Sequence, residues 1–442
     1  MSLEIFDRLE SEVRGYCRMF PDLFERAAGA RLYTHDGREY LDFFSGAGAL
    51  SYGHNHPRIQ RALIDYLEAG GVTHALDMST VAKRDFIRTF EAVILQPRGL
   101  DYKVQFPGPT GTNAVEAALK LARKVTGRSN VLCFTNGYHG MTLGALAVTG
   151  NSTNRAAAGV ALGNTVAMPF DGYFGHGIDT LEYLETYLQD ASSGLDKPAA
   201  AILETVQAEG GVHPASWDWL RRLAVLLAKH RILLIVDDIQ AGCGRTGPFF
   251  SFEPAGIVPD IVCLSKSISG YGLPMALVLM RRELDCWKPG EHNGTFRGFN
   301  LAFVGARAAL DFWRGEELQK AVEAAAEIVR RRLALIHRRY TEACGPPRGR
   351  GLLQGIPCTP AEVAGRVSRA AFERGLVVET CGAEEQVVKL LPPLTIDEPS
   401  LEMGLEILDT AFSDVLGADG EAGGSRSAAG PSPKGSPPED GA

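Results

Sequence analysis

The sequence lacks the features that mark membrane-spanning, secreted and nucleic-acid-binding proteins. It has no run of about 18 apolar residues, the length that a transmembrane helix needs. Residues 1–21 contain acidic side chains and no apolar signal core. The formal charge is −8, and no segment collects lysine and arginine without acidic neighbours. We therefore expect a cytoplasmic protein that binds neither membranes nor nucleic acids.

The eight cysteines are scattered along the chain, and no two of them form a C-x-x-C pair. This spacing argues against a disulfide framework and against a zinc site, so we expect a reducing compartment and no bound metal. The remaining composition is that of an ordinary globular protein, with 442 residues of which 45% are hydrophobic and 22% charged. Small metabolites are the expected partners of such a chain.

From about residue 100, short apolar runs alternate with helical patterns. The runs are apolar almost throughout, as expected of strands that helices cover on both faces. Alternation of this kind predicts an α/β fold with a mainly parallel sheet. The predicted strands are residues 102–106, 131–135, 199–204, 232–236, 260–265 and 276–280.

The C-terminal third has a different pattern. Residues 303–340 read as helices, and short strand patterns at 349–358 and 387–396 flank another helix at 362–375, which predicts a smaller α+β domain. The last residues have almost no apolar content, which predicts disorder. We expect an N-terminal segment that joins the small domain (1–60), a large domain (61–305), a C-terminal small domain (306–416) and a disordered tail (417–442).

Charged residues follow two of the predicted strands. Asp237 and Asp238 come directly after the run 232–236, and Lys266 follows the next run. Each has an ordinary explanation, since an aspartate can cap a turn and a lysine can reach solvent from a strand end. In open α/β sheets, however, ligands bind outside the carboxyl ends of the strands, so that Asp237 and Lys266 would project into one crevice.

A lysine that is partly removed from water favours its neutral amine and can form a Schiff base with an aldehyde. Pyridoxal 5'-phosphate supplies such an aldehyde, and its ring nitrogen needs an acidic partner, for which Asp237 is the candidate. We interpret the small residues around Lys266 as room for a flat cofactor and a moving substrate. They are Ser265, Ser267, Ser269, Gly270 and Gly272.

Two further segments offer groups for this cofactor. Gly111 and Thr112 open an amphipathic helix, whose N-terminal N–H groups could bind phosphate, although ordinary helix capping also explains this pattern. Tyr138 and His139 follow the strand 131–135. The tyrosine could stack on the cofactor ring or pack a loop. The histidine could be a general base; with no second ligand at metal spacing nearby, we discount a metal.

Seven motifs in order resemble the class III aminotransferases of pyridoxal-phosphate fold type I, and the resemblance covers the chain except its tail. They occupy residues 40–57, 111–123, 136–140, 204–211, 237–247, 264–274 and 292–300. The resemblance implies that Lys266 is the Schiff-base lysine and proton shuttle, and that Asp237 contacts the pyridine nitrogen. It further implies roles in cofactor binding for Gly111, Thr112, Tyr138, His139, Gln240 and Thr295.

In this family the residue at the Thr295 position usually serves the neighbouring subunit, which implies a homodimer or a higher homo-oligomer. Within the class, the motifs are similar to the diaminobutyrate aminotransferases of the ectoine pathway. These exchange an amino group between L-glutamate and L-aspartate 4-semialdehyde. The resemblance makes Glu209 a gate residue, and Lys389 stands where related ω-aminotransferases have an arginine that binds a substrate carboxylate.

Four positions depart from what close relatives usually show: Ala49, Ser51, Ala208 and Phe299. Several of them lie in motifs that line the substrate side, and we include Ala49 and Ser51 among the predicted substrate-binding residues. Neutral drift explains such changes, but lost polar groups can also change the substrate. An alternative function is therefore γ-elimination or carbon–carbon bond formation on another γ-substituted amino acid, such as S-adenosylmethionine. A third hypothesis is a non-catalytic dimer that binds pyridoxal phosphate.

Overall fold

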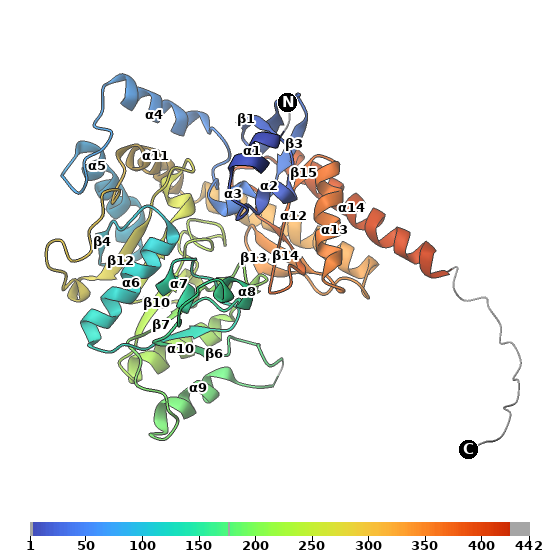
Figure 1. Ribbon diagram of the computed structural model, residues 1–442. Helices are drawn as coiled ribbons and strands as arrows, with labels where there is room; N and C mark the ends of the chain where they lie inside the picture. Colours follow the sequence, from blue (N-terminus) through green and yellow to red (C-terminus); the bar gives the residue numbers. More distant parts are fainter. Residues whose placement is uncertain (1–2, 176, 425–442) are drawn as a thin grey trace, which may run out of the picture.

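The computed structural model describes residues 3–175 and 177–424 of the chain. Its centre is a seven-stranded sheet in the order β4-β12-β11-β10-β7-β5-β6 (Figure 1). Only β12 runs antiparallel to its neighbours, β11 and β4. The strands are β4 (Tyr102–Gln105), β5 (Val131–Phe134), β6 (Thr165–Met168), β7 (Ala200–Leu203), β10 (Leu233–Asp237), β11 (Ile261–Leu264) and β12 (Leu277–Arg281).

The mainly parallel sheet is confirmed, and each of the six predicted runs contains a strand. The strand β6 was not predicted. It lies at the edge of the sheet and is only partly buried, so it lacks the continuous apolar run that burial on both faces imposes on the other strands.

Helices cover this sheet on both faces. The helix α6 (Gly111–Thr126) turns its apolar face toward the strands, and Val115, Leu119 and Ala122 on that face are fully buried beside Ile235 of β10. The other helices of this part are α4 (Pro57–Glu68), α5 (Val81–Phe90), α7 (Leu143–Ala147), α8 (Ser152–Ala156), α9 (Thr180–Gln189), α10 (Trp217–Lys229) and α11 (Asn300–Leu310).

The long helix α12 (Glu317–Arg339) leads to the C-terminal part, where β13 (Arg348–Arg350), β14 (Leu353–Pro357), β17 (Val387–Leu390) and β16 (Glu379–Cys381) form an antiparallel sheet. This part also contains α13 (Glu362–Glu373), β15 (Leu376–Val377) and α14 (Glu398–Gly424).

The N-terminal segment joins this C-terminal part, since β3 pairs in parallel with β15 (Figure 1). The N-terminal elements are α1 (Glu4–Leu9), α2 (Tyr16–Met19), β1 (Phe24–Ala28), β2 (Arg31–Thr34), β3 (Glu39–Asp42) and α3 (Ser45–Gly48). A short hairpin of β8 (Val206–Gln207) and β9 (His213–Pro214) completes the strands of the described residues.

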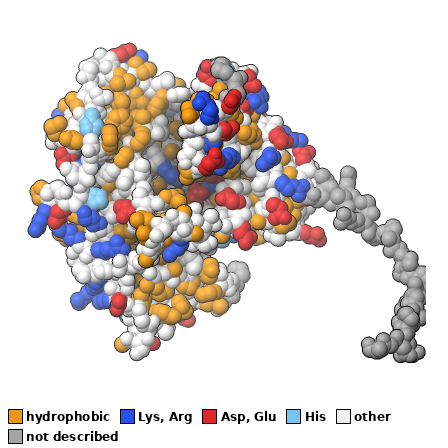
Figure 2. Space-filling view, viewed as in Figure 1, with side chains coloured by type: hydrophobic (Ala, Val, Ile, Leu, Met, Phe, Trp, Pro, Cys, Tyr) orange, Lys and Arg blue, Asp and Glu red, His pale blue; other side chains and the backbone are white. Residues whose placement is uncertain are grey.

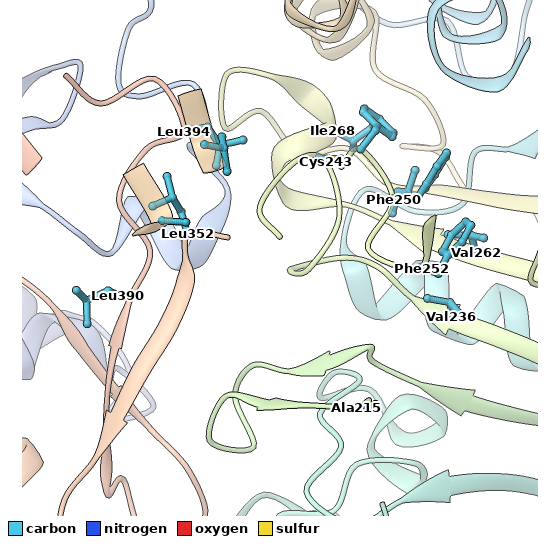
Figure 3. Close-up of a cluster of buried hydrophobic side chains, with 14 of the residues drawn as sticks. Ala215, Val236, Cys243, Phe250, Phe252, Val262, Ile268, Leu352, Leu390 and Leu394 are labelled. Atoms are coloured by element: carbon cyan, nitrogen blue, oxygen red, sulfur yellow. The ribbon is translucent and has the colours of Figure 1, made fainter. Parts of the chain in front are cut away.

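One hydrophobic core connects the central sheet with the C-terminal part. Val236 and Val262 of the central sheet belong to the same buried cluster as Leu352, Leu390 and Leu394 (Figure 3). A continuous core of this kind holds the carboxyl end of β10 at a set position relative to β17. That relation matters because both strands carry charged residues of the candidate site.

The expected tail begins differently from the prediction. Residues 417–424 continue the helix α14, and residues 425–442 lie outside the described part of the chain. The domain boundaries themselves stay predictions. Within the described ranges, no helix combines the length and apolarity that crossing a bilayer requires.

Candidate active site

Lys266 lies directly after β11 and lines a cavity of about 660 Å³. Its backbone has a φ of 50°, a left-handed conformation that costs a non-glycine residue about 1–3 kcal/mol. Neighbouring hydrogen bonds hold this conformation: the Ser265 hydroxyl donates to the Met275 carbonyl at 2.7 Å, and Ser267 donates to Gly48 at 2.6 Å. Burial lowers the pKa of the Lys266 ammonium more than nearby Glu209 raises it, which favours the neutral amine.

The two glycines near Lys266, Gly270 and Gly272, lie in tight packing contacts and do not provide room for a cofactor. A side chain at Gly270 would begin 2.4 Å from the Ala309 Cβ, and one at Gly272 would begin 2.8 Å from Leu50. Of this stretch, Lys266 is the one residue among those described that lines the cavity. The close approach of α11 and of the loop after α3 leaves no space for larger side chains here.

The other walls of the cavity come from six separate segments of the chain. Besides Lys266, the predicted residues Tyr138 and Glu209 line it. The remaining lining residues were not among the predicted site residues: some lie within the family motifs without a charged or aromatic side chain to mark them, and the others lie outside the motifs. They are Tyr16, Ala47, Asn136, Gly137, Gly150–Asn154, Gly210 and Cys381–Ala383 together with Glu385.

Asp237 and His139 form a buried pair at the carboxyl end of β10. The imidazole Nδ1 lies 2.7 Å from the Asp237 Oδ2, and both side chains are almost fully buried. Burial alone would lower the pKa of His139, but the hydrogen bond and the charge of Asp237 outweigh burial and raise it. The Nε2 of His139 has no hydrogen-bond partner within the described structure. The other oxygen of the Asp237 carboxylate, Oδ1, accepts a hydrogen bond from the Ile239 N–H at 3.2 Å.

Asp238 is in a different environment from Asp237. It accepts a hydrogen bond from the backbone N–H of Ser251 at 3.1 Å, and burial raises its pKa to about 7. Successive residues of a strand point to opposite faces, which explains why only one of the two acids meets His139. The geometry thus distinguishes Asp237 from Asp238, which follow each other in the sequence.

A second charged cluster flanks the cavity near the end of β17. Lys389 is fully buried, and its Nζ lies 2.7 Å from the Glu209 Oε1 and 3.1 Å from the Glu379 Oε1. Burial opposes the ammonium charge, but the two carboxyl groups raise the pKa of Lys389. Burial would likewise raise the pKa of Glu209, yet Lys389 and Lys266 lower it to about 2. Glu209 and Lys389 are therefore a closed ion pair, and Gln240 donates to the same Glu209 oxygen at 2.9 Å.

Glu204 supports the loop that carries Tyr138. Its carboxyl group accepts the Tyr138 N–H at 2.9 Å and the Ala208 N–H at 3.1 Å. Burial raises the pKa of Glu204 to about 7. The sequence signal for this residue is an acid at the end of an otherwise apolar strand, the same signal that marks Asp237.

Gly111 and Thr112 form the first turn of α6, and a side chain on Gly111 would begin 3.0 Å from Ile239, two residues beyond Asp237. The N-terminus of α6 thus lies next to the carboxyl end of β10. The Thr112 hydroxyl lies 2.6 Å from the Thr142 hydroxyl. Thr295 lies apart from these residues: it is exposed, and its carbonyl lies 3.0 Å from the His74 Nε2.

The two predicted substrate residues of the N-terminal segment differ in burial. Ala49 is half-buried, whereas Ser51 is fully buried and lies 2.5 Å from the Ser267 hydroxyl and 3.1 Å from an Arg245 nitrogen. Neither belongs to the cavity lining of the described residues. Their role in substrate binding stays a prediction, and the hydrogen bonds of Ser51 connect it to the turn that carries Lys266.

The donor set of the site fits pyridoxal phosphate. Lys266 offers an amine on the cavity, Asp237 offers a carboxylate that no cation other than His139 contacts, and Tyr138 offers an aromatic face on the cavity wall. The first N–H groups of α6 have no partner within the helix, as at every helix N-terminus, and can take a phosphate. The residues present therefore match the aldehyde, the ring nitrogen, the ring face and the phosphate of this cofactor.

Comparisons with known proteins agree with this donor set. The family model described as aminotransferase class III matches residues 14–412. The diaminobutyrate–2-oxoglutarate transaminase of Nocardia farcinica is 59% identical over 412 residues, which cover 93% of this chain and 94% of that protein. The enzyme of the same name from Streptomyces coelicolor is 57% identical over 415 residues, 93% of this chain and 98% of that protein.

Solved structures show the same fold. Ornithine aminotransferase from Toxoplasma gondii, whose active site holds pyridoxal phosphate at partial occupancy, superimposes with a TM-score of 0.82 at 28% identity over 94% of each chain. These likenesses favour transamination over γ-elimination on another amino acid and over a non-catalytic dimer. The chain therefore belongs to the class III aminotransferases of fold type I, enzymes whose cofactor is pyridoxal 5'-phosphate.

Proposed function

We propose that this aminotransferase converts L-2,4-diaminobutyrate and 2-oxoglutarate into L-aspartate 4-semialdehyde and L-glutamate, and the reverse. The observation that carries the proposal is the 59% identity, over 93% of the chain, to an enzyme named for the first two of these compounds. The charged cluster beside the cavity supports it, because the amino-acid and keto-acid substrates all have carboxylates that need a cation.

The cofactor supplies an aldehyde and an electron-withdrawing ring, and the chain supplies the groups around it. Lys266, which lines the cavity with its amine favoured in the neutral form, holds the cofactor and then carries the proton to and from the reacting substrate carbon. Asp237 would hold the ring nitrogen of the bound cofactor, and the hydrogen bond to His139 fixes that carboxylate. Tyr138 would hold the ring, and the N-terminus of α6 at Gly111 and Thr112 would hold the phosphate.

Glu209 and Lys389 select between the two substrates. In L-glutamate a carboxylate sits on the carbon that carries the reacting amine, whereas the γ-amine of diaminobutyrate lies three carbons from its carboxylate. A closed Glu209–Lys389 pair presents no free cation at the cavity wall, which suits the γ-amine end of diaminobutyrate. If Glu209 turns away, Lys389 becomes available for the α-carboxylate of L-glutamate.

The absorbance of the bound cofactor tests this function directly. Adding L-glutamate or L-2,4-diaminobutyrate separately to the purified holoenzyme should remove its visible absorbance band, since both are amino donors. Adding 2-oxoglutarate after the first amine, or L-aspartate 4-semialdehyde after the second, should restore the band. L-Ornithine, one carbon longer than diaminobutyrate, is the control amine. A band that ignores both proposed donors would contradict the function.

The finer assembly and location are also proposals. We propose a cytoplasmic homodimer in which Thr295 completes the partner's phosphate site. The location is supported by the eight cysteines, all of which are free thiols. The dimer is supported by the exposure of Thr295 and Phe296 and by hydrophobic side chains that gather over α4 and α11 (Figure 2). The exposed apolar residues of α4 and of the segment that follows it are Ile64, Leu67, Val72, Leu76, Met78 and Val81.

Charged substitutions on this apolar surface should dissociate the dimer. Met78 and Val81 are 61% and 64% exposed in the single chain, so aspartate at both positions leaves the core of the subunit intact. We expect Met78→Asp/Val81→Asp to sediment as a monomer and to bind the cofactor at least about 10-fold more weakly, because a lost charge-assisted phosphate contact is worth 1.5–3 kcal/mol. Val225→Asp, at a 71% exposed position on α10, is the control. A monomeric wild type would contradict the proposal.

A further inference from the structure

Glu379 is a buried acid that the proposed mechanism does not use. Its side chain is 2% exposed, and it lies on β16 directly opposite Lys389 of β17 in the antiparallel ladder. Its Oε1 is 3.1 Å from the Lys389 Nζ. Lys389 thus has two carboxyl partners, one on the cavity side and one within the sheet.

The two partners of Lys389 differ in how firmly the fold holds them. Glu379 is fixed by strand pairing, because cross-strand neighbours cannot separate without breaking the ladder. Glu209 lies in the turn between β8 and β9, lines the cavity and keeps a quarter of its side chain exposed. Glu209 can therefore leave Lys389 by rotating its side chain into the cavity, whereas Glu379 has a side chain only 2% exposed and does not line that cavity.

A buried ammonium that loses its partner is unstable. Removing one member of a buried ion pair costs about 3–5 kcal/mol, because the remaining charge is neither hydrated nor paired. Lys389 is fully buried, so a lone departure of Glu209 would carry a cost of this kind. A second carboxyl group at 3.1 Å removes most of that cost, since the ammonium keeps a partner throughout.

We infer that Glu379 is a positioning residue for substrate selection, which holds the Lys389 ammonium in place while Glu209 moves aside for the α-carboxylate of the amino donor. The inference rests on the proposed exchange of L-glutamate with a γ-amine substrate, and it deepens that proposal. The γ-amine substrate reacts with the Glu209–Lys389 pair closed and does not need Glu379. L-Glutamate reacts with the Glu209–Lys389 pair open, and this reaction needs Glu379.

The electrostatics of the cluster agree with this role. Burial raises the pKa of Glu379 to about 8 against the pull of Lys389, so that Glu379 is mostly protonated at neutral pH while Glu209 carries the negative charge. When Glu209 withdraws, Glu379 faces Lys389 without a competing anion, which favours its ionised form. The other ionisable groups that interact electrostatically with Glu379 are Lys266, Tyr16 and Cys381.

Separate half-reactions of the holoenzyme test the inference. Glu379→Gln keeps the size of the side chain and an acceptor for Lys389 but removes the charge. We expect kcat/KM for L-glutamate to fall about 10-fold or more, because the buried Lys389 ammonium loses the second partner of its ion pair, while kcat/KM for L-2,4-diaminobutyrate changes less than about 2-fold. Glu384→Gln, the same change at an exposed position on the following turn, is the control and should change neither. Equal losses with both amines would overturn the inference.

A second measurement does not depend on the substrates. The midpoint of urea unfolding at saturating cofactor is measured for Lys389→Met, for Glu379→Gln and for the double variant. The double variant should shift the midpoint by clearly less than the sum of the two single shifts, because each substitution removes the partner of the other residue. Additive shifts would overturn the inference. If the wild type reacts with neither amine, the proposed function fails, and this cycle still decides whether Glu379 supports Lys389.

Discussion

Replacing Lys266 by alanine should abolish transamination while leaving the fold intact. The side chain lines the cavity, and burial lowers the pKa of its ammonium so that the amine can take up a proton from the substrate carbon. A positioned general base contributes roughly 10²–10⁴-fold to a rate, and Lys266 is also the proposed anchor of the cofactor, so we expect kcat to fall by at least about 10³-fold. Steady-state rates with diaminobutyrate and 2-oxoglutarate measure this loss.

Two controls make the result specific. Lys320→Ala removes an exposed lysine from α12 and should leave kcat unchanged. Adding a small primary amine such as ethylamine to Lys266→Ala should restore part of the rate, because a free amine can replace the missing proton carrier but not a missing fold. Full activity of Lys266→Ala would contradict the assignment of this residue.

Asp237→Asn is expected to have the second-largest effect. The carboxylate is buried at the end of β10, where it is the charged partner of His139 at 2.7 Å. An amide keeps the shape but loses the negative charge that we propose as the partner of the ring nitrogen of the cofactor. Losing one preorganised electrostatic contact in an active site costs about 10²–10³-fold in kcat, which is the loss we expect here.

A spectroscopic readout separates this electrostatic role from a structural one. Asp237 raises the pKa of His139 against the effect of burial, so Asp237→Asn should lower that pKa below the value of a free histidine, as NMR of the imidazole would report. The matched control is Asp238→Asn, since Asp238 is equally buried but has its pKa raised to about 7 and bonds Ser251. It should change kcat only a few-fold, and similar losses in both variants would contradict the assignment.

Much of the fold follows from local pattern. The runs that became β5, β7, β10 and β11 are apolar throughout because helices cover both faces of the sheet, and such runs are visible without any tertiary information. The edge strand β6 escaped prediction because partial exposure relaxes that requirement. The helical continuation of residues 417–424 escaped because a short segment of alanine, glycine and acids has no apolar face to mark it.

Some residues of the candidate site could likewise be predicted from the sequence, and others could not. Asp237 and Lys266 could be found from sequence because both follow apolar strands, and the carboxyl ends of neighbouring parallel strands meet at one edge. The role of Gly270 could not be predicted correctly, since a small residue fits both an open pocket and a tight contact. Only the packing of α11 against this turn decides between the two.

The sequence by itself determined six of the seven strands of the central sheet, the positions of Lys266 and Asp237 at strand ends, and the motifs of the family. Tertiary structure alone decided which of two adjacent aspartates meets His139, and it brought Glu209, Lys389 and Glu379 together from a turn and two strands. The physical reason is range: hydrophobic periodicity acts over a few residues along the chain. The charge of a buried group is set by whatever residues the fold places within a few ångströms, however distant they are in sequence.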